Sequence, residues 1–379
     1  EANEAYWGGR PVVDGVVVRF YAAGDALADD LEAGRLDGAW GVPAGRFEDL
    51  DGGGRETVEA VQPDVDVLVF NCAEGGDGHP ALRDPVVRAA LAWAIDRERL
   101  ADEAYGPAGA PAGSLVPAGL AAGPVDYHRE LPEEAAAYDP ERAVTELDAA
   151  GYRDADGDGR REDAMGRPLE LRLLVRETSP EHVAAAGRIA DRLVAVGVFV
   201  EVETLDDAGL AARVWRTVDG EPRPDFDLLL WGWRGDVDPE FVLSTLTTSS
   251  IGTWNQAGWS STAYDELYRQ QARTLDAVAR RDLIWRMQDV IAAEAPLVPL
   301  VYTRTLEAYD TRHWSGWTPS PGEGGGVVCG HQIDSYLRLR PQDPGVLWGL
   351  PLWAAAALAG AALGLVLAFV VVLRRRRRR

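Results

Sequence analysis

The sequence predicts an α/β domain followed by one transmembrane helix. Between Leu169 and Trp231, apolar runs typical of strands alternate with helical patterns, an order that builds a sheet covered by helices. Residues 346–373 contain no charged side chain, and they exceed the roughly 20 residues with which a helix crosses a bilayer. Six arginines, residues 374–379, follow at once and are expected to stay in the cytoplasm. The part before residue 346 is therefore expected outside the cell.

The first third of the chain shows strand and helix patterns in turn. Asp84 and Pro85 predict the start of a helix, because aspartate caps the first amides and proline fits the first helical position. Val87, Leu91 and Ile95 recur at helical spacing and mark its buried face. The other expected elements are strands at 12–20 and 65–71, a helix at 25–34 and a loop-dominated connection at 105–137.

From residue 138 onward the alternation becomes regular. Asp139 and Pro140 predict another helix start, and Gly151 predicts the end of that helix. Strands are expected at 169–175, 198–204, 226–231 and 297–302. Helices are expected from Ser179 to Gly197, in a short stretch before Trp215, and at 261–273 and 276–294.

Composition and charge favour an exported protein and exclude one that binds nucleic acid. The net charge is −23, whereas the phosphates of nucleic acid require a basic surface. The two cysteines, Cys72 and Cys329, have no spacing typical of a zinc site; they either form a disulfide outside the cell or remain two separate buried thiols. No signal peptide is visible although the topology requires export, so we expect the sequence to be part of a longer protein.

The segment 231–239 is the richest candidate for a binding site. It follows an apolar strand directly, at the end where open α/β sheets place their ligands. Trp231 and Trp233 offer flat apolar walls, and Asp236 offers a negative charge. In the alternative interpretation the tryptophans fill the core and Asp236 caps a turn. A second loop supplies Trp254, which can stack on a ligand, and Asn255, which can hydrogen-bond its amides.

Asp154, Asp156 and Asp158 resemble the first, third and fifth ligands of a calcium-binding EF-hand loop. The twelfth position, where a glutamate should bind the ion through both oxygens, is Met165. An acidic turn between a helix and a strand is therefore the favoured interpretation, and calcium binding is the weaker one. The sequence holds no motif of a hydrolase, a phosphate-binding loop or a zinc site. We expect neither catalysis nor a cofactor.

Several of these segments, taken in order, resemble the peptide/oligopeptide (family 5) solute-binding proteins of ABC importers. Residues 84–97 are very close to the family's Asp-x-x-Val-Arg-x-Ala-x-x-x-Ala-Ile-Asp-Arg stretch. Residues 3–11 resemble its Asn-Pro-x-Tyr-Trp-Gly segment, with Glu4 and Ala5 as a departure. Further matches lie at 31–37, 70–71, 138–152 and 264–267, so the resemblance covers about residues 1–320.

The resemblance implies a two-lobed clamshell of the type II periplasmic-binding-protein kind, incomplete here because the chain enters the family pattern part-way. It places the second part of the large lobe at 1–137 and the other α/β lobe at 138–305. The return to the large lobe and a stalk follow at 306–345, before the transmembrane helix at 346–373 and the cytoplasmic tail at 374–379. It also implies that Asp236 pairs with a peptide's α-amino group and that Trp233 lines the pocket.

The sequence therefore predicts a membrane-anchored, extracellular solute-binding component of an ABC importer, which binds peptides or a similar amine-bearing solute by lobe closure. Its expected partners are the solute, the permease subunits and the lipid bilayer around the C-terminal helix. The alternative is a cell-surface sensor or adhesion protein that uses the same clamshell without transport. Neighbouring permease genes would favour the importer, and a neighbouring kinase gene would favour the sensor. An enzyme is a distant third possibility.

Overall fold

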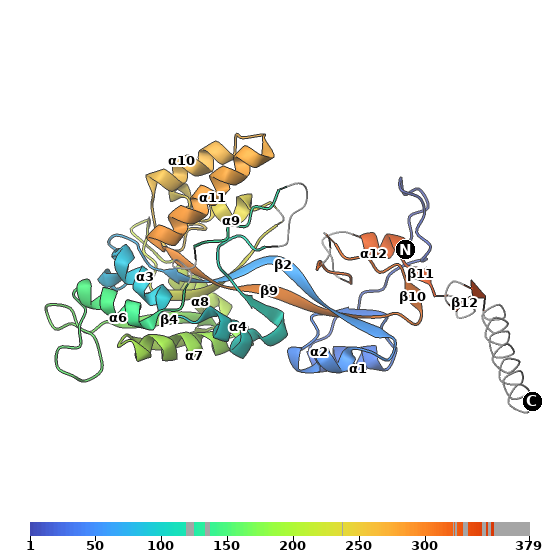
Figure 1. Ribbon diagram of the computed structural model, residues 1–379, viewed down its shortest axis with the longest axis horizontal. Helices are drawn as coiled ribbons and strands as arrows, with labels where there is room; N and C mark the ends of the chain where they lie inside the picture. The colour runs from blue at the N-terminus through green and yellow to red at the C-terminus, as the bar shows by residue number, and fades with distance from the viewer. Residues whose placement is uncertain are drawn as a thin grey trace, which may run out of the picture.

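The computed structural model describes residues 1–118, 125–132, 137–236, 238–320, 322, 324–328, 333–342, 346–347 and 350–351. The chain forms two bodies that are connected by two long strands, β2 (Arg55–Phe70) and β9 (Leu297–Asp310) (Figure 1). The larger body holds most of the helices, whereas the smaller body holds α1 (Gly24–Glu32) and α2 (Ala44–Leu50).

One mixed sheet runs through both bodies. Its strand order is β1-β9-β2-β8-β4-β5, in which β1 is Gly38–Trp40, β8 is Leu228–Arg234, β4 is Glu170–Arg176 and β5 is Phe199–Leu205. A further strand, β3 (Gly109–Pro111), pairs with β9. β4 pairs parallel with β5 and β8, whereas β2 pairs antiparallel with β8 and β9. The predicted α/β alternation is confirmed.

Two helices of the larger body begin where the sequence predicts. α3 (Pro85–Trp93) follows Asp84, whose side chain accepts a hydrogen bond from the Val86 amide at 2.9 Å. α6 (Pro140–Ala149) follows Asp139, which caps the Arg142 amide at 2.9 Å. The longer elements that complete the body are α4 (Arg97–Tyr105), α7 (Pro180–Ala195), α8 (Asp207–Val214), α9 (Glu240–Ser244), α10 (Thr262–Gln271) and α11 (Ala277–Glu294).

The remaining described elements are short. They are 3-10 turns at Pro80–Arg83, Gly106–Ala108 and Thr248–Ser250, the strand pairs β6 (Thr217–Val218) with β7 (Glu221–Pro222) and β10 (Trp314–Ser315) with β11 (Arg340–Pro341), and α12 (Asp334–Arg338). Figure 1 shows α12 and the pair β10–β11 in the smaller body.

Each body has its own hydrophobic core. The core of the larger body contains side chains from Val65 to Val301 along the sequence, among them the predicted helix face Val87, Leu91 and Ile95. The core of the smaller body combines side chains of 28–50 with side chains of 306–308 near the end of β9. The predicted domain boundary at residue 137 therefore lies inside the range that builds the larger core. The change from one core to the other takes place within β2 and β9.

β2 and β9 pass between the bodies through an irregular stretch. Val61 lies opposite Arg304 and Val65 lies opposite Tyr302, so residues 62–64 of β2 face a single residue of β9. Pro63 has no amide hydrogen to donate, and its carbonyl oxygen accepts a hydrogen bond from the Gly235 amide at 3.0 Å. Extra residues of this kind bend a strand and interrupt its ladder. The connection between the bodies therefore has a locally weakened point at 62–64.

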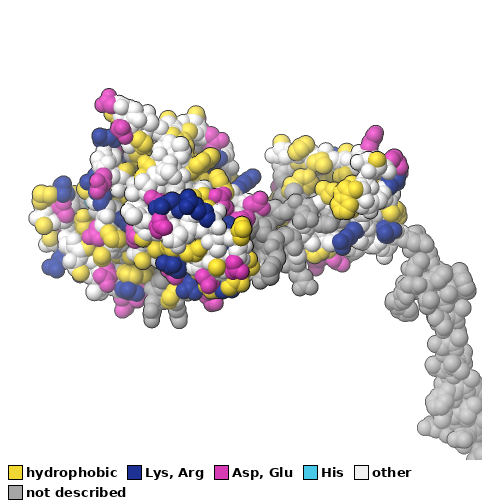
Figure 2. Space-filling model, turned by 90° about the horizontal axis from the view of Figure 1, so that it is seen from above, with side chains coloured by type: hydrophobic (Ala, Val, Ile, Leu, Met, Phe, Trp, Pro, Cys, Tyr) yellow, Lys and Arg dark blue, Asp and Glu magenta, His cyan; other side chains and the backbone are white. Residues whose placement is uncertain are grey.

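Residues 12–20, which were predicted to form a strand, do not form one in this structure. Val17 is 83% exposed and Phe20 is 91% exposed. Together with Trp314 and Trp317, this segment lines a mainly apolar cavity of about 520 Å³ in the smaller body. A strand needs a neighbour for its backbone, and no strand of the described residues pairs with this segment. The smaller body consequently shows exposed apolar surface (Figure 2).

The predicted membrane-spanning segment falls almost wholly outside the described residues. Its described parts are β12 (Val346–Leu347) and β13 (Leu350–Pro351), which pair with each other, so the predicted helix does not begin at Val346. Within the part of the chain that the structure describes, no helix combines the length and the hydropathy needed to cross a membrane. The arginine tail 374–379 and Cys329 also lie outside the described residues. Cys72 is a free, buried thiol, and burial raises its pKa to about 11.

Candidate functional site

A cavity of about 490 Å³ lies where β2 and β9 leave the larger body, next to the end of β8. We call it the hinge cavity. A volume of this size is typical of sites for small ligands. Its lining comes from β2, α4, the start of α7, β8 and β9, and includes Gln62, Asp64, Asp66, Tyr105, Arg176, Thr178, Ser179, Glu181, His182, Trp231, Gly232, Trp233, Arg234 and residues 303–305. The predicted residues Trp231 and Trp233 are therefore part of this site.

An aromatic cluster lies on the face of β8 opposite to Gly232 and Asp66, because side chains alternate between the two faces of a strand. Trp233 lies at its centre, with ring centroids 6.2 Å from Trp231, 6.2 Å from Phe241 and 6.4 Å from Trp254. The Phe241 and Trp254 rings are 5.6 Å apart. Edge-to-face contacts of this kind are favourable beyond the area that they bury. Trp233 is 5% exposed and supports the cluster, whereas Trp254 is 50% exposed and keeps a face for another molecule.

The floor of the hinge cavity is polar. Asp66 projects from β2 and is only 5% exposed. Its Oδ2 accepts a hydrogen bond from the Tyr105 hydroxyl at 2.8 Å and lies 3.0 Å from Nε2 of His182. Burial, followed by the charge of Asp66, raises the pKa of Tyr105. The hydroxyl therefore stays protonated and donates a hydrogen bond to the carboxylate. Three side chains from three elements are thereby held together.

Gly232 leaves space beside the Asp66 carboxylate because it has no side chain. Asp66 and Gly232 are paired residues of neighbouring strands, β2 and β8. A Cβ atom on Gly232 would lie 2.6 Å from Oδ1 of Asp66 and 3.6 Å from Cε1 of His182. The first of these distances is shorter than a non-bonded contact allows. Any larger residue at this position would push the carboxylate out of its place.

The cavity carries charges of both signs. Arg176 is paired with Asp207 at 3.2 Å, and its guanidinium carbon lies 5.4 Å from the centre of the Trp231 ring. Arg304 is paired with Glu59. The first turn of α7 also faces the cavity, and its N-cap residue Ser179 makes no side-chain capping hydrogen bond. The partial positive charge of a helix N-terminus therefore lies beside the floor.

The other predicted site residues lie outside the hinge cavity. Asp236 is exposed and is absent from the lining. Asn255 is 3% exposed, and its Nδ2 donates hydrogen bonds to the carbonyl oxygens of Thr247 at 3.1 Å and Trp259 at 2.9 Å. The amide group of Asn255 therefore holds its own loop together. Trp254 joins the aromatic cluster without lining the cavity.

Sequence reasoning missed Asp66, Tyr105, His182 and Phe241. Tyr105 and His182 are remote from Asp66 along the chain and carry no local motif, so only the folded chain brings them together. Asp66 did carry a signal, because it is the single charged residue within the apolar run 65–70. A charged side chain in a buried strand is more informative than an exposed apolar one.

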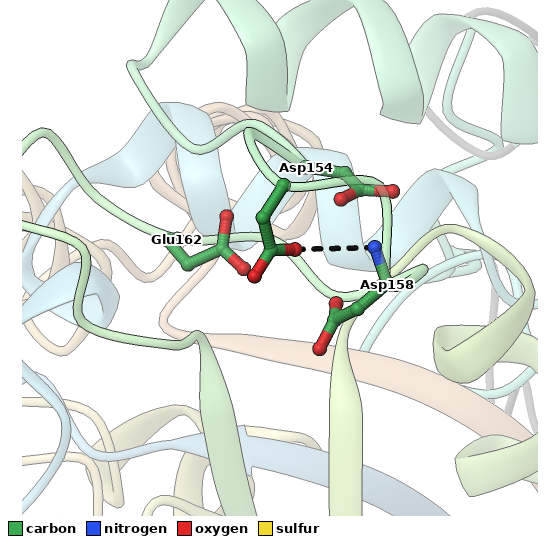
Figure 3. Close-up of side chains that lie close together, drawn as sticks. Asp154, Asp158 and Glu162 are labelled. Carbon is green, nitrogen blue, oxygen red and sulfur yellow. Dashed lines mark hydrogen bonds between the residues drawn. The ribbon is translucent and has the colours of Figure 1, made fainter.

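The acidic loop between α6 and β4 gathers its carboxylates (Figure 3). Oxygen atoms of Asp154, Asp156, Asp158 and Glu162 lie within 4.8 Å of one another. These groups also serve the loop itself. The Asp154 carboxylate accepts hydrogen bonds from the amides of Gly157 at 2.7 Å and Gly159 at 3.0 Å, and Glu162 accepts one from the Ala155 amide at 3.0 Å. These bonds favour the acidic turn, and calcium binding stays the weaker prediction.

Comparison with known proteins identifies relatives for most of the chain. Residues 1–254 match the family described as "Bacterial extracellular solute-binding proteins, family 5 Middle". The probable ABC transporter periplasmic-binding protein SapA of Escherichia coli is 27% identical over 319 residues, which are 82% of this chain and 52% of SapA. Di/tripeptide-binding protein 2 of Pseudomonas aeruginosa is 26% identical over 333 residues, 84% of this chain and 56% of that protein. The chain thus spans about half the length of these relatives.

Solved structures share the same fold. The substrate-binding protein CtaP of Listeria monocytogenes superimposes with a TM-score of 0.72 at 20% identity, over 90% of this chain and 63% of CtaP. The oligopeptide-binding protein AppA of Bacillus subtilis, solved with a nonapeptide, gives a TM-score of 0.66 at 20% identity, again over 90% and 63%. The predicted periplasmic-binding-protein-like α/β fold is thereby confirmed.

Proposed function

Because the chain belongs to family 5 of the bacterial extracellular solute-binding proteins, we propose that it binds a peptide or a similar amine-bearing solute and delivers it to an ABC importer. The hinge cavity is the observation that carries this proposal, since it holds a buried carboxylate in a cavity of ligand size at the connection between two bodies. The family is one of binding proteins, so catalysis has no place in the proposal.

The proposed mechanism is a change in the angle between the two bodies. The cavity is lined by Trp231 and His182 of the larger body and by Gln62 and residues 303–305 of the connecting strands. A ligand that contacts both sets of residues favours the arrangement in which they are close, which shifts the population toward the closed form. The interrupted ladder at 62–64 is the natural place for the bend.

We expect the wild-type chain to retain tripeptides from an equimolar library in native mass spectrometry, and to lose them when the library is N-acetylated. By the family resemblance, Asp236 pairs with the α-amino group, so Asp236→Asn should weaken binding at least tenfold, as the loss of a charge-assisted hydrogen bond predicts. Asp191→Asn, an exposed aspartate on α7, removes the same charge and should bind as the wild type does. A wild-type chain that retains no peptide would contradict the proposal.

The membrane arrangement is part of the same proposal. With a membrane anchor within residues 346–373 and residues 374–379 in the cytoplasm, a C-terminal epitope tag should resist protease added to intact cells while the larger body is cleaved. Detergent should remove the protection. Cleavage of the tag on intact cells would place the C-terminus outside and refute this topology.

A further inference from the structure

The carboxylate of Asp66 points to a ligand contact that no family resemblance assigns. We propose that Asp66 binds a positively charged nitrogen of the solute, an ammonium or guanidinium group, at the floor of the hinge cavity. This inference rests on the proposed function and deepens it, because it names the chemistry of the ligand group that enters the cavity. Asp236, the residue that the resemblance suggests for this role, is exposed and does not line the cavity.

The two oxygens of Asp66 have different surroundings. Oδ2 is occupied by the Tyr105 hydroxyl at 2.8 Å and by Nε2 of His182 at 3.0 Å. Oδ1 has no hydrogen bond from any residue that the structure describes. Two donors on one oxygen fix the orientation of the carboxylate. Its second oxygen can therefore accept a hydrogen bond from a ligand without a further loss of side-chain entropy. Tyr105 and His182 are therefore positioning residues for Asp66.

The strand next to Asp66 leaves space beside this second oxygen. Gly232 has no side chain, and a Cβ atom there would lie 2.6 Å from Oδ1. A carboxylate oxygen with open space beside it is a suitable surrounding for a cation, with which it can form a charge-assisted hydrogen bond.

The charges around the floor favour a cation over an anion. Three carboxylates, Asp64, Asp66 and Glu181, line the cavity together with three arginines, and two of these arginines, Arg176 and Arg304, are paired with Asp207 and Glu59. The N-terminus of α7 adds only a partial positive charge, which is smaller than the full charge of one carboxylate. A ligand carboxylate placed at the floor would instead meet the negative charge of Asp66, which is 5% exposed, and like charges repel more strongly near a buried group than in water. The group that reaches the floor is therefore positively charged.

The test compares Asp66→Asn with the wild type and with Asp191→Asn. Asparagine keeps the size of the side chain, and its single oxygen can still accept from Tyr105 and His182, while its amide group replaces the free oxygen with a donor. The probes are the tripeptide Ala-Ala-Ala, its N-acetylated form, N-acetyl-Ala-Lys-Ala, and the free amine agmatine, each titrated by calorimetry. We expect Asp66→Asn to bind the cationic probes roughly 10- to 100-fold more weakly, with a melting temperature close to that of the wild type.

The probes separate the sources of the cation. Binding of Ala-Ala-Ala that is lost in Asp66→Asn and kept in Asp236→Asn assigns the α-amino group to Asp66. Binding of N-acetyl-Ala-Lys-Ala that is lost in Asp66→Asn assigns a side-chain cation. Gly232→Ala should reproduce the loss, because its methyl group displaces Oδ1. Asp66→Asn with wild-type affinity for a probe that the wild type binds would overturn the inference and leave the proposed function standing. Binding of agmatine without any peptide, lost in Asp66→Asn, would overturn the peptide function and support the inference. No binding of any probe by the wild type would overturn both.

Discussion

Replacing Trp233 by alanine should lower the free energy of unfolding by about 3–5 kcal/mol, the range for a large aromatic side chain removed from a core. The Trp233 side chain is 5% exposed and touches Trp231, Phe241 and Trp254. Its removal leaves a cavity and frees three aromatic rings from their common support. Chemical denaturation followed by circular dichroism measures the change, and the midpoint should fall without a change in slope.

Trp254→Ala is the matched comparison for Trp233→Ala. Half of the Trp254 surface is exposed, so its removal should cost about 1 kcal/mol, in line with the smaller area that it buries. The same variant removes an exposed ring beside the hinge cavity and tests whether that ring contacts ligand. Equal destabilisation by the two variants would show that Trp233 is not the centre of the cluster.

Replacing Arg88 by methionine should destabilise the larger body by about 3–5 kcal/mol, because several buried carbonyl groups lose their donor at once. Arg88 is 3% exposed, and its guanidinium donates to the carbonyl oxygen of Ala295 at 3.0 Å and to that of Leu82 at 2.8 Å. It also donates to the carbonyl oxygen of Glu294, so it closes the C-terminal end of α11. Thermal denaturation of the purified chain checks the loss.

Arg83→Met gives the control for the Arg88 variant. Arg83 lies five residues earlier and is exposed, so methionine there removes the same charge without stripping buried carbonyls of a partner. Its melting temperature should stay close to that of the wild type. A similar fall in both variants would mean that net charge, and not the hydrogen bonds of Arg88, sets the stability. Arg88 belongs to the segment 84–97 that carried the family resemblance, and its role here is structural.

Local chemistry decided which parts of the fold could be predicted. Asp84 and Asp139 cap their helices as expected, because an N-cap depends on only a few neighbouring residues. β2 was predicted only from residue 65. Residues 55–62 of this strand are mostly polar and half-buried, so they show no run of apolar side chains that would indicate a strand. Residues 12–20 have the composition of a strand but no neighbouring strand in the described chain. Strand formation depends on such a partner more than on composition.

Of the residues around the candidate site, only the tryptophans could be predicted from the sequence. Trp231, Trp233 and Trp254 could be identified because tryptophans next to an apolar run are conspicuous in a sequence, although Trp231 and Trp233 lie on β8 and not on a loop after it. The polar floor of the cavity could not be predicted, because only the folded sheet places Asp66 beside Gly232 on the neighbouring strand. No pattern along the chain encodes that pairing, since the two positions belong to segments that meet only after folding.

The position of β9 in the sheet determines when the protein can fold during its synthesis. β9 is the last long strand of the chain, yet it lies between β1 and β2, which are made much earlier. Until residue 310 has left the ribosome, β2 therefore presents an unpaired edge that includes its apolar stretch 65–70. Neither body can complete its share of the sheet before that moment, and contacts over such separations form slowly. The nascent chain consequently depends on protection against aggregation from the synthesis of β2 until that of β9.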